Sequence, residues 1–366
     1  MKIECRIEDL KKCVQSVDRI TSTNISLPIL ETVLITVSKK QCIIRATNMQ
    51  LGVEIEVPVK VEEEGIVAIK SSILNSFLSN QSQSGFITLE TEQDNLIIST
   101  NTSNARINTL PYEEFPTLPH ITDGEYITIP REIFTIGVPS VVYSASVSEI
   151  RPEMSSVYIY QNDGEVKLVA TDGFRLAEKK IPLTIKIPSL IIPHKNAIEI
   201  SKILSGSNNE IEIKATKTQL VVIDVVDGLY ITSRIIDGVF PDYQQIIPKE
   251  HKTDVVLLKS DILNAVKTSN IFTDKFNHIV LSVDKNSNTI VVSSKSNDVG
   301  IFTSSIPATI NGESIEMSIN YRYLTDCLAV IQDESIRFSF TVKEKPMVIQ
   351  PLHDLNFLYL IMPLNR

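Results

Sequence analysis

The stretch Val166–Ala177, with the sequence Val-Lys-Leu-Val-Ala-Thr-Asp-Gly-Phe-Arg-Leu-Ala, is the segment from which the fold is interpreted. From Val166 to Ala170, apolar residues occupy every second position, which predicts a β-strand. Asp172 and Gly173 then predict a sharp turn, because glycine adopts positive φ angles without steric cost. A phenylalanine, an arginine and a leucine follow at once. An Asp-Gly pair is a common turn signal, so these residues alone predict an ordinary strand–turn–strand.

Length and composition limit the class of protein. A chain of 366 residues predicts two or three domains with cores of their own. Hydrophobic residues make up 43% and charged residues 22%, which is typical of a globular rather than a disordered chain. The formal net charge of −9 disfavours free electrostatic binding to nucleic acid. Any contact with DNA therefore requires a local basic surface or a topological link.

The spacing of cysteine and histidine does not indicate a metal site. The four cysteines contain no C-x-x-C pair and no histidine lies at ligand spacing from them, so we expect no metal ion and no cofactor. Cys13 and Cys327 fall on apolar helix faces, where we expect them to act as small hydrophobic residues. The N-terminal residues lack the apolar core of a signal peptide, and no apolar run is long enough to span a membrane. We therefore expect a cytoplasmic protein without membrane contact.

Apolar periodicity predicts helical segments that alternate with β-hairpins. The helices are expected at residues 7–17, 71–78, near 131, 194–204, 260–269 and 320–331. The hairpins are expected to pair residues 33–37 with 42–46, 157–160 with 166–170, and 279–283 with 289–293. Ser71 is expected near the N-cap of its helix and Gly206 as a C-cap. Gly137 and Pro139 should shorten or kink the helix near residue 131.

The spacing of these segments indicates an internal repeat. The triplet Ala46-Thr47-Asn48 recurs as Ala170-Thr171-Asp172, 124 residues later, and Phe115-Pro116 recurs as Phe240-Pro241, 125 residues later. The period is too long for a solenoid unit, so each copy is expected to be a domain. We predict an α+β fold of three similar domains, each with two helices packed on strand-rich antiparallel sheets. The predicted boundaries are 1–121, 122–246 and 247–366.

Catalytic motifs are missing from the sequence. It contains no phosphate-binding G-x-x-x-x-G-K-[ST] loop, no G-x-S-x-G elbow and no H-E-x-x-H helix, and its five histidines are scattered. The acidic run Glu62–Glu64 is interpreted as a solvated turn. A binding protein is therefore favoured. Two alternatives stay open: a hydrolase or transferase whose site is assembled across domains, and a scaffold that never meets DNA.

Apolar residues near the ends of predicted segments favour a peptide-binding groove. They are Met154, Leu176, Ile246 and the run Leu360–Leu364. Polar residues that could form its rim are Thr171, Arg175, Asn320 and Tyr323. For each apolar residue, packing in the core is the alternative.

Short motifs along the whole chain resemble one family. Besides Ala170–Ala177, they are Leu27-Pro28-Ile29-Leu30, Thr109-Leu110-Pro111, Phe115-Pro116, Asp237-Gly238, Phe240-Pro241-Asp242-Tyr243 and Met362-Pro363. Together with the length and the triple repeat, they resemble the bacterial DNA polymerase III β subunits, the replicative sliding clamps. The resemblance implies a DNA-clamp fold with three domains per subunit. It also implies a homodimer, joined head to tail through the first and third domains into a six-domain ring, with helices lining the hole.

The resemblance also implies a function without catalysis. Such a ring encircles duplex DNA without sequence preference and acts as a processivity factor in DNA replication. It tethers the replicative polymerase, the clamp loader and other proteins that carry a linear motif similar to Gln-Leu-x-Leu-Phe. That motif docks between the second and third domains. The matching positions here are Arg151, Met154, Thr171, Gly173, Phe174, Arg175, Leu176, Pro241, Gln245, Ile246, Asn320, Tyr323, Pro346, Leu360, Ile361, Met362, Pro363 and Leu364.

Several positions depart from the usual family pattern. Phe174 stands where histidine is frequent, Gln245 and Pro346 replace a basic and a small polar residue, and the chain ends Leu364-Asn365-Arg366. We therefore expect an altered peptide preference. Pro152-Glu153 lies where two tyrosines often contact DNA, and Asn24 replaces an arginine, so those DNA contacts are not transferred to this chain.

Basic residues on the polar faces of the predicted helices are candidates for the DNA channel, with ordinary solvated side chains as the alternative. They are Lys12, Arg19, Lys195, Lys202 and Lys267. By resemblance, the subunit interface would involve Ile107 on one side and Ile271 and Phe272 on the other.

Overall fold

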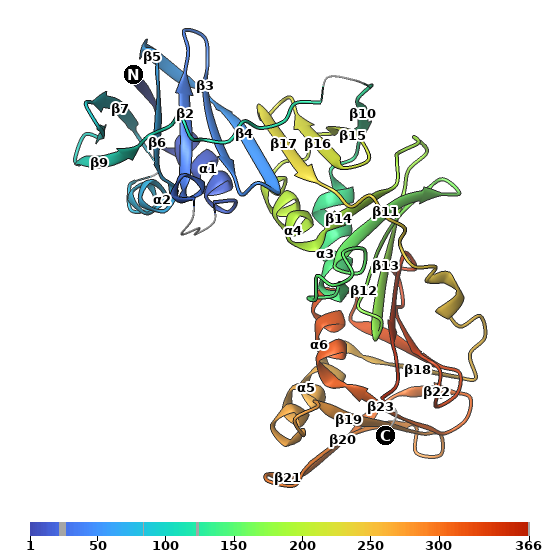
Figure 1. Cartoon of the computed structure of the whole chain (residues 1–366). Helices are drawn as coiled ribbons and strands as arrows, with labels where there is room; N and C mark the ends of the chain where they lie inside the picture. Colours follow the sequence, from blue (N-terminus) through green and yellow to red (C-terminus); the bar gives the residue numbers. More distant parts are fainter. Residues whose placement is uncertain (22–26, 83, 122–123, 365–366) are drawn as a thin grey trace. The chain divides into compact units, whose positions relative to one another are not determined.

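The computed structural model describes residues 1–21, 27–82, 84–121 and 124–364 (Figure 1). The chain forms two compact units. Unit 1 comprises residues 1–135 and 195–237, and unit 2 comprises residues 136–194 and 238–366. Asn24, Asn365 and Arg366, which the sequence singled out, lie outside the described residues.

Unit 1 is built on an antiparallel sheet of thirteen strands in the order β10-β15-β16-β17-β4-β3-β2-β6-β9-β8-β7-β1-β5. Their bounds are β1 (Lys2–Arg6), β2 (Thr32–Val37), β3 (Cys42–Thr47), β4 (Leu51–Val57), β5 (Val59–Glu63), β6 (Gly65–Lys70), β7 (Phe86–Glu92), β8 (Asn95–Ser99), β9 (Asn104–Leu110), β10 (Ile127–Ile129), β15 (Ile211–Ala215), β16 (Gln219–Asp224) and β17 (Leu229–Arg234). The helices of this part are α1 (Ile7–Asp18), α2 (Ser71–Ser79) and α4 (His194–Ile203), whose first residue belongs to unit 2.

Unit 2 contains two antiparallel sheets, ordered β14-β11-β12-β13-β26-β25-β24-β18-β22 and β21-β20-β19-β23. Their bounds are β11 (Ser156–Asn162), β12 (Glu165–Thr171), β13 (Arg175–Pro182), β14 (Leu190–Pro193), β18 (Thr253–Leu258), β19 (His278–Asp284), β20 (Thr289–Ser296), β21 (Gly300–Pro307), β22 (Thr309–Asn311), β23 (Ile315–Asn320), β24 (Ser335–Phe340), β25 (Met347–Pro351) and β26 (Phe357–Ile361). The helices are α3 (Val138–Val141), α5 (Lys259–Ser269) and α6 (Tyr321–Val330).

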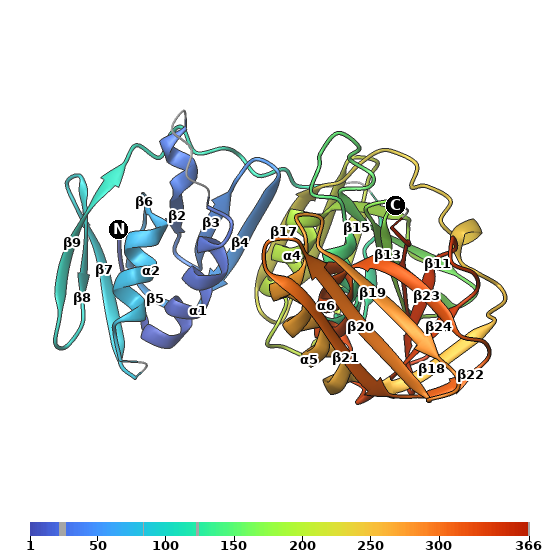
Figure 2. The ribbon, with the colours of Figure 1, turned by 90° about the horizontal axis from the view of Figure 1, so that it is seen from below.

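Paired helices cover the sheets as their apolar spacing predicts. In α1, Leu10, Cys13, Val14 and Val17 are buried at helical spacing, and the helix packs against α2. In Figure 2, α5 and α6 lie side by side on the sheet that contains β19, β20 and β21. The predicted two-helix, strand-rich α+β plan is therefore confirmed.

The helix near residue 131 is distorted as expected. Residues Ile133–Gly137 form a π-helical turn, and α3 then lasts only four residues. A Cβ atom on Gly137 would lie 2.7 Å from a methyl carbon of Leu168, so the strand beneath leaves no room for a larger residue. In α2, Ser71 lies near the N-cap as expected, at the first residue of the helix. Lys70 occupies the N-cap without a side-chain hydrogen bond.

All three predicted hairpins form, and the repeat continues in how the strands pair. β4, which follows the turn at residues 47–51, pairs with β17, the last strand of the second copy. β13, which follows the turn at residues 171–175, pairs in the same way with β26, the last strand of the third copy. β21 occupies the matching place in the third copy, and among the described residues it pairs only with β20.

Candidate partner-binding site

The predicted peptide site is organised by the turn at residues 171–175, here called the second junction turn. The Thr171 hydroxyl donates a hydrogen bond to the Arg175 carbonyl (2.7 Å) and accepts one from the Gly173 N–H (3.1 Å). The Asp172 carboxylate accepts the N–H groups of Phe174 (2.9 Å) and Arg175 (3.0 Å). Gly173 has a φ of 90°, which glycine adopts without strain. The frame presents the Phe174 ring to solvent, with 58% of the residue exposed.

The end of the chain closes on this turn. β13 and β26 pair so that Leu176 faces Leu360, and the Met362 N–H donates to the Phe174 carbonyl (2.8 Å). The Leu364 N–H donates to the Ser318 carbonyl (2.8 Å), which extends the attachment beyond the strand. Met362, which is half-buried, therefore lies beside Phe174 in the paired backbone.

One guanidinium connects the turn to α6. The Arg175 Nε atom lies 3.0 Å from the Asp172 carboxylate, and its Nη1 atom lies 2.6 Å from that of Asp326. The same guanidinium stacks over the Tyr323 ring, 4.8 Å from its centroid. Burial, and then the charge of Asp172, raises the pKa of Tyr323, so its hydroxyl stays protonated at neutral pH. One cation between two carboxylates fixes α6 against the turn.

The groups beneath the guanidinium are unreactive. Burial raises the pKa of the Cys327 thiol well above its ordinary value, and it raises the pKa values of Tyr143 and Tyr359 in the same way. Thiolates, not thiols, are the nucleophilic form. Cys327 therefore packs as a small apolar residue, as the sequence predicted, and this arrangement supports binding rather than covalent chemistry.

Met154 borders the turn on its other side. Its terminal methyl lies 3.5 Å from the place where a Cβ atom of Gly173 would stand, so glycine leaves room for this contact. The Arg151 guanidinium lies 3.9 Å from the Met154 sulfur. Met154, Phe174 and Met362 thus give the site apolar side chains that solvent can reach.

Comparison with known proteins assigns the chain to a family. Three domain models of the DNA polymerase III beta subunit match it: the N-terminal domain at residues 1–119, the central domain at 128–242 and the C-terminal domain at 244–365. The chain is 27% identical to the beta sliding clamp of Bacillus subtilis (strain 168) over 381 residues, which span 100% of both proteins.

The chain belongs to the DNA polymerase III beta subunit family. It is a replicative sliding clamp, the non-catalytic processivity subunit that works with DNA and a polymerase.

Solved structures agree with this membership. The crystal structure of the Bacillus subtilis DNA polymerase sliding clamp superposes with a TM-score of 0.90 at 26% identity, over 100% of this chain and 99% of that one. The DNA polymerase III beta subunit from Thermotoga maritima superposes with a TM-score of 0.93 at 23% identity, over 100% and 99%, and shows the shared fold.

The structure gives the site residues predicted for this clamp different environments. Four of them are buried and pack in the core: Leu176, Leu360, Ile361 and Pro346. Asn320 caps α6 by accepting the Arg322 N–H (2.9 Å). The others that solvent can reach are Arg151, Pro241, Gln245, Ile246, Tyr323, Pro363 and Leu364.

The sequence did not indicate that Asp326 belongs to the site, where it pairs with Arg175. Asp326 lies three residues after Tyr323 on α6, so helical periodicity places both side chains on one face. That spacing was the available signal, but an isolated aspartate on a helix does not reveal its partner 151 residues away.

The DNA-channel candidates are all exposed. Lys12 lies 3.9 Å from Asp227, and Lys202 lies 2.8 Å from Glu199, so these two lysines have acidic neighbours within the chain. Among the interface candidates, Ile271 is 63% exposed and the Phe272 ring stacks on Phe302 with centroids 5.7 Å apart.

The remaining interface candidate, Ile107, is only 6% exposed. Its side chain therefore packs within its own chain. It could meet a partner only through its backbone.

Proposed function

We propose that two copies of the chain form a ring around duplex DNA and that β21 of one copy pairs with β9 of the other. The free edge of β21 carries this proposal. Its equivalents, β4 and β13, each pair with the last strand of the next repeat, and β9 is the last strand of the first repeat. Among the described residues, β9 pairs with β6 only at residues 109 and 110, so residues 104–108 keep a free edge opposite β8.

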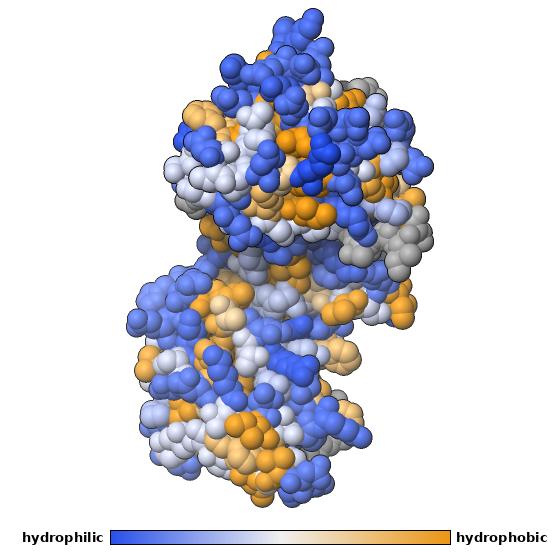
Figure 3. Space-filling model, turned by 90° about the vertical axis from the view of Figure 1, so that its left-hand side faces the viewer, coloured by the Kyte–Doolittle hydropathy of each residue, from blue (hydrophilic) through white to orange (hydrophobic). Residues whose placement is uncertain are grey.

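The repeat also fixes an expected register. Gly52 faces Thr232 and Leu176 faces Leu360 at the two pairings within the chain. The corresponding residues at the contact between copies are Ile301 of β21 and Ile107 of β9. A hydrophobic patch at this strand supports the contact, because Ile271 and Ile301 are 63% and 68% exposed and the turn Asn270–Phe272 lies against β21. Figure 3 shows such a patch at the lower end, at the height of α5 and β21 in Figure 1.

Mass measurement tests the dimer. Light scattering at micromolar concentration should give twice the 40.9 kDa of one chain. Ile301→Lys should shift the population to monomer, because the new charge would be buried without a partner. Val225→Lys, at a position 71% exposed in unit 1, is the matched control and should stay dimeric. A wild-type protein that is monomeric at this concentration would sink the proposal.

We infer that DNA is held by topology, with the exposed basic residues of the helices making phosphate contacts without base readout. A surface binder with about 6–10 phosphate contacts loses roughly 10³–10⁵ in affinity between 50 and 200 mM salt. Clamps that a cognate loader with ATP has placed on closed circular DNA should remain on the DNA when salt is raised from about 50 to 200 mM. They should dissociate once the circle is cut. Equal release rates and equal salt slopes on circular and linear DNA would contradict encirclement.

We propose that partner proteins, including the replicative polymerase and the clamp loader, dock a linear peptide at the second junction turn. Phe174, Met154 and Met362 supply the accessible apolar contacts, and burial of one apolar anchor contributes roughly 1.5–3 kcal/mol. Met362→Ala should weaken a Gln-Leu-x-Leu-Phe-type peptide by about tenfold. Calorimetry that finds unchanged affinity in the folded variant would place the site elsewhere.

We propose domain boundaries at 1–121, 122–246 and 247–366, which the matched family segments support to within a few residues. No helix among the described residues is long and apolar enough to cross a membrane. The four cysteines are buried and free, which fits a reducing compartment, and we infer that the protein works in the cytoplasm.

A further inference from the structure

The turn at residues 47–51, here called the first junction turn, has the same hydrogen-bonded frame as the second. The Thr47 hydroxyl donates to the Leu51 carbonyl (3.0 Å) and accepts the Met49 N–H (3.1 Å). The Asn48 side-chain carbonyl accepts the N–H groups of Gln50 (3.0 Å) and Leu51 (2.8 Å). These donors and acceptors match those of the second junction turn position by position.

The strand that closes on the first junction turn is equivalent too. The Arg234 N–H donates to the Gln50 carbonyl (2.8 Å), just as the Met362 N–H donates to the Phe174 carbonyl. Arg234 therefore occupies the place of Met362. The side chains around the first junction turn differ from those around the second, so they can form a binding site with different chemistry.

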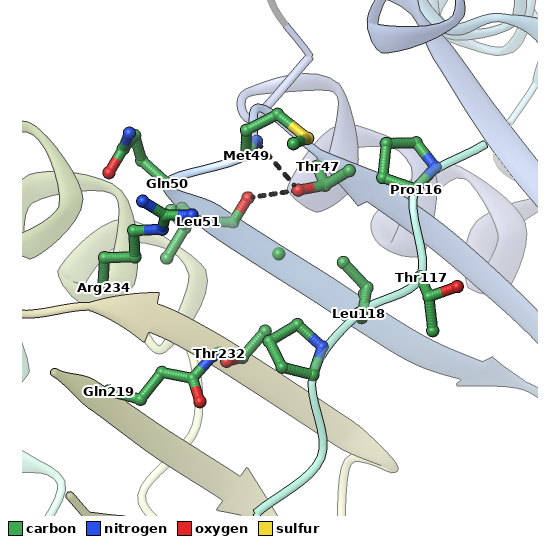
Figure 4. Close-up of a pocket in the computed structure, with 12 residues that line it drawn as sticks. Thr47, Met49, Gln50, Leu51, Pro116, Thr117, Leu118, Gln219, Thr232 and Arg234 are labelled. Carbon is green, nitrogen blue, oxygen red and sulfur yellow. Dashed lines mark hydrogen bonds between the residues drawn. The ribbon is translucent and has the colours of Figure 1, made fainter. Parts of the chain in front are cut away.

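A pocket of about 310 Å³ opens beside the first junction turn, entirely within unit 1 (Figure 4). This volume lies at the lower end of the range of ligand sites, about 300–1,000 Å³. In Figure 4, Met49, Leu118 and Thr232 are among the side chains that surround the hollow, and the segment with Pro116 closes one side.

The floor of the pocket depends on a glycine. A Cβ atom on Gly52 would lie 2.5 Å from a methyl carbon of Leu118 and 3.1 Å from the Thr232 methyl. Leucine stands at the equivalent position 176 of the second repeat. In the first repeat, the absence of a side chain at Gly52 therefore leaves room for Leu118, which comes from the segment between β9 and β10. Leu118 forms part of the pocket wall.

One cation distinguishes the chemistry of this pocket. Arg234 is exposed, lines the pocket, and has no ion pair among the residues that the structure describes. Gln50 and Gln219 add amide groups to the rim. An apolar wall with a single unpaired guanidinium at its edge fits a ligand that offers an aliphatic side chain next to a carboxylate.

We propose that this pocket is a second peptide-binding site, which takes a short segment of a partner polypeptide with an aliphatic residue beside an acidic one. The proposal goes beyond the clamp function, because it concerns a different repeat. It follows from the shared turn frame, the pocket and the charge of Arg234. Its selectivity differs from that of the second junction turn, since an arginine replaces Met362 and a glutamine replaces Phe174.

Methionine methyl groups report the two sites separately. The chain has six methionines, of which Met49 lines the first pocket while Met154 and Met362 border the second junction turn. Protein with ¹³C-labelled methionine methyls is titrated with the acetylated, amidated peptide Gln-Leu-Asp-Leu-Phe, and the Met49 signal is assigned by Met49→Leu. The Met49 methyl should shift saturably at up to millimolar peptide, with a dissociation constant independent of that seen at Met362.

Charge variants test the recognition. Arg234→Glu should weaken binding at the Met49 reporter by about threefold or more and leave the Met362 shift unchanged. Arg337→Glu, at an exposed position on β24, is the matched control and should change neither. The peptide with asparagine in place of aspartate should bind less tightly at the Met49 reporter alone.

The possible results separate the two proposals. Shifts at Met154 and Met362 with a silent Met49 would overturn the second site and leave the site at the second junction turn standing. A shift at Met49 alone would overturn the site at the second junction turn and support the pocket beside the first junction turn. Silence at all three would overturn both. A Met49 shift that Arg234→Glu leaves unchanged would overturn the recognition of a carboxylate by Arg234.

Discussion

The first and second junction turns have the same hydrogen bonds between side chain and backbone and differ in the side chains of their last three positions. Each has a threonine whose hydroxyl bridges the turn and an Asx residue that accepts two N–H groups. At the last position of the frame, Leu51 is buried at 1% exposure, whereas Arg175 joins Asp172 to Asp326. The threonine and Asx residues therefore maintain the frame, and the remaining positions can diverge into different binding surfaces.

The largest expected effects come from Leu51→Ala and Arg175→Ala. Removing the buried leucine should lower the free energy of unfolding by about 2–5 kcal/mol through loss of packing. Removing Arg175 leaves two carboxylates near each other, at a cost of about 3 kcal/mol. Urea titrations at low and high salt distinguish the causes, because salt screens the second effect only. Equal salt dependence for both variants would show that the two positions are not differentiated in this way.

Changes to the Asx residues should have smaller and unequal effects. Asn48→Ala removes two neutral hydrogen bonds, worth about 1 kcal/mol each. Asp172→Ala removes two charged ones and the pair with Arg175, so its cost should be about 1–2 kcal/mol greater. Hydrogen exchange at the amides of residues 50–51 and 174–175 measures the local loss of protection. Greater deprotection in the Asn48 variant would contradict the expected order.

The third positions of the turns should respond with opposite signs. Met49 has a φ of 71°, a strained value for a residue with a side chain, whereas glycine already occupies the equivalent position 173. Met49→Gly should stabilise unit 1 by up to about 1 kcal/mol, and Gly173→Ala should destabilise unit 2 by about the same amount. Thermal unfolding of both variants is the measurement. A loss of stability in Met49→Gly would show that contacts of the methionine outweigh its strain.

The smallest effect is expected at Thr232. This residue is 4% exposed, and its hydroxyl has no hydrogen-bond partner among the described residues, whereas an apolar Leu360 holds the equivalent place in the other pairing. Thr232→Val should leave stability unchanged or raise it by up to about 1 kcal/mol, because an unpaired buried hydroxyl is removed. Unfolding titrations that show a loss of stability in Thr232→Val would reveal that the Thr232 hydroxyl forms a hydrogen bond to ordered water.

Sequence periodicity was enough to predict the elements of both turns. Alternation and the Asp-Gly signal placed β12, the turn and β13, and the 124-residue spacing related them to the first repeat. The pairing of β4 with β17 was not predictable from these signals. A strand's own residues determine which of its faces is buried but not which distant strand supplies its hydrogen bonds.

The candidate site was only partly predictable for a related reason. Apolar residues at Leu176 and Leu360 fit a groove and a core equally well in the sequence, and packing buries both. The ion pair between Arg175 and Asp326 depends on how α6 meets the turn, which local propensity does not encode. Ile107 has the same limitation, since alternation in β9 did not reveal which face is covered.

The free edge of β21 has a consequence for how copies add to one another. Its proposed partner is a different strand, so every chain would carry one edge of each kind and an assembly could grow by repeated addition. Growth stops only when the two unused edges of one assembly meet. The geometry of the chain between its β9 edge and its β21 edge then determines how many copies form a closed ring. A substitution that altered this geometry and left both edges intact would convert closed dimers into filaments.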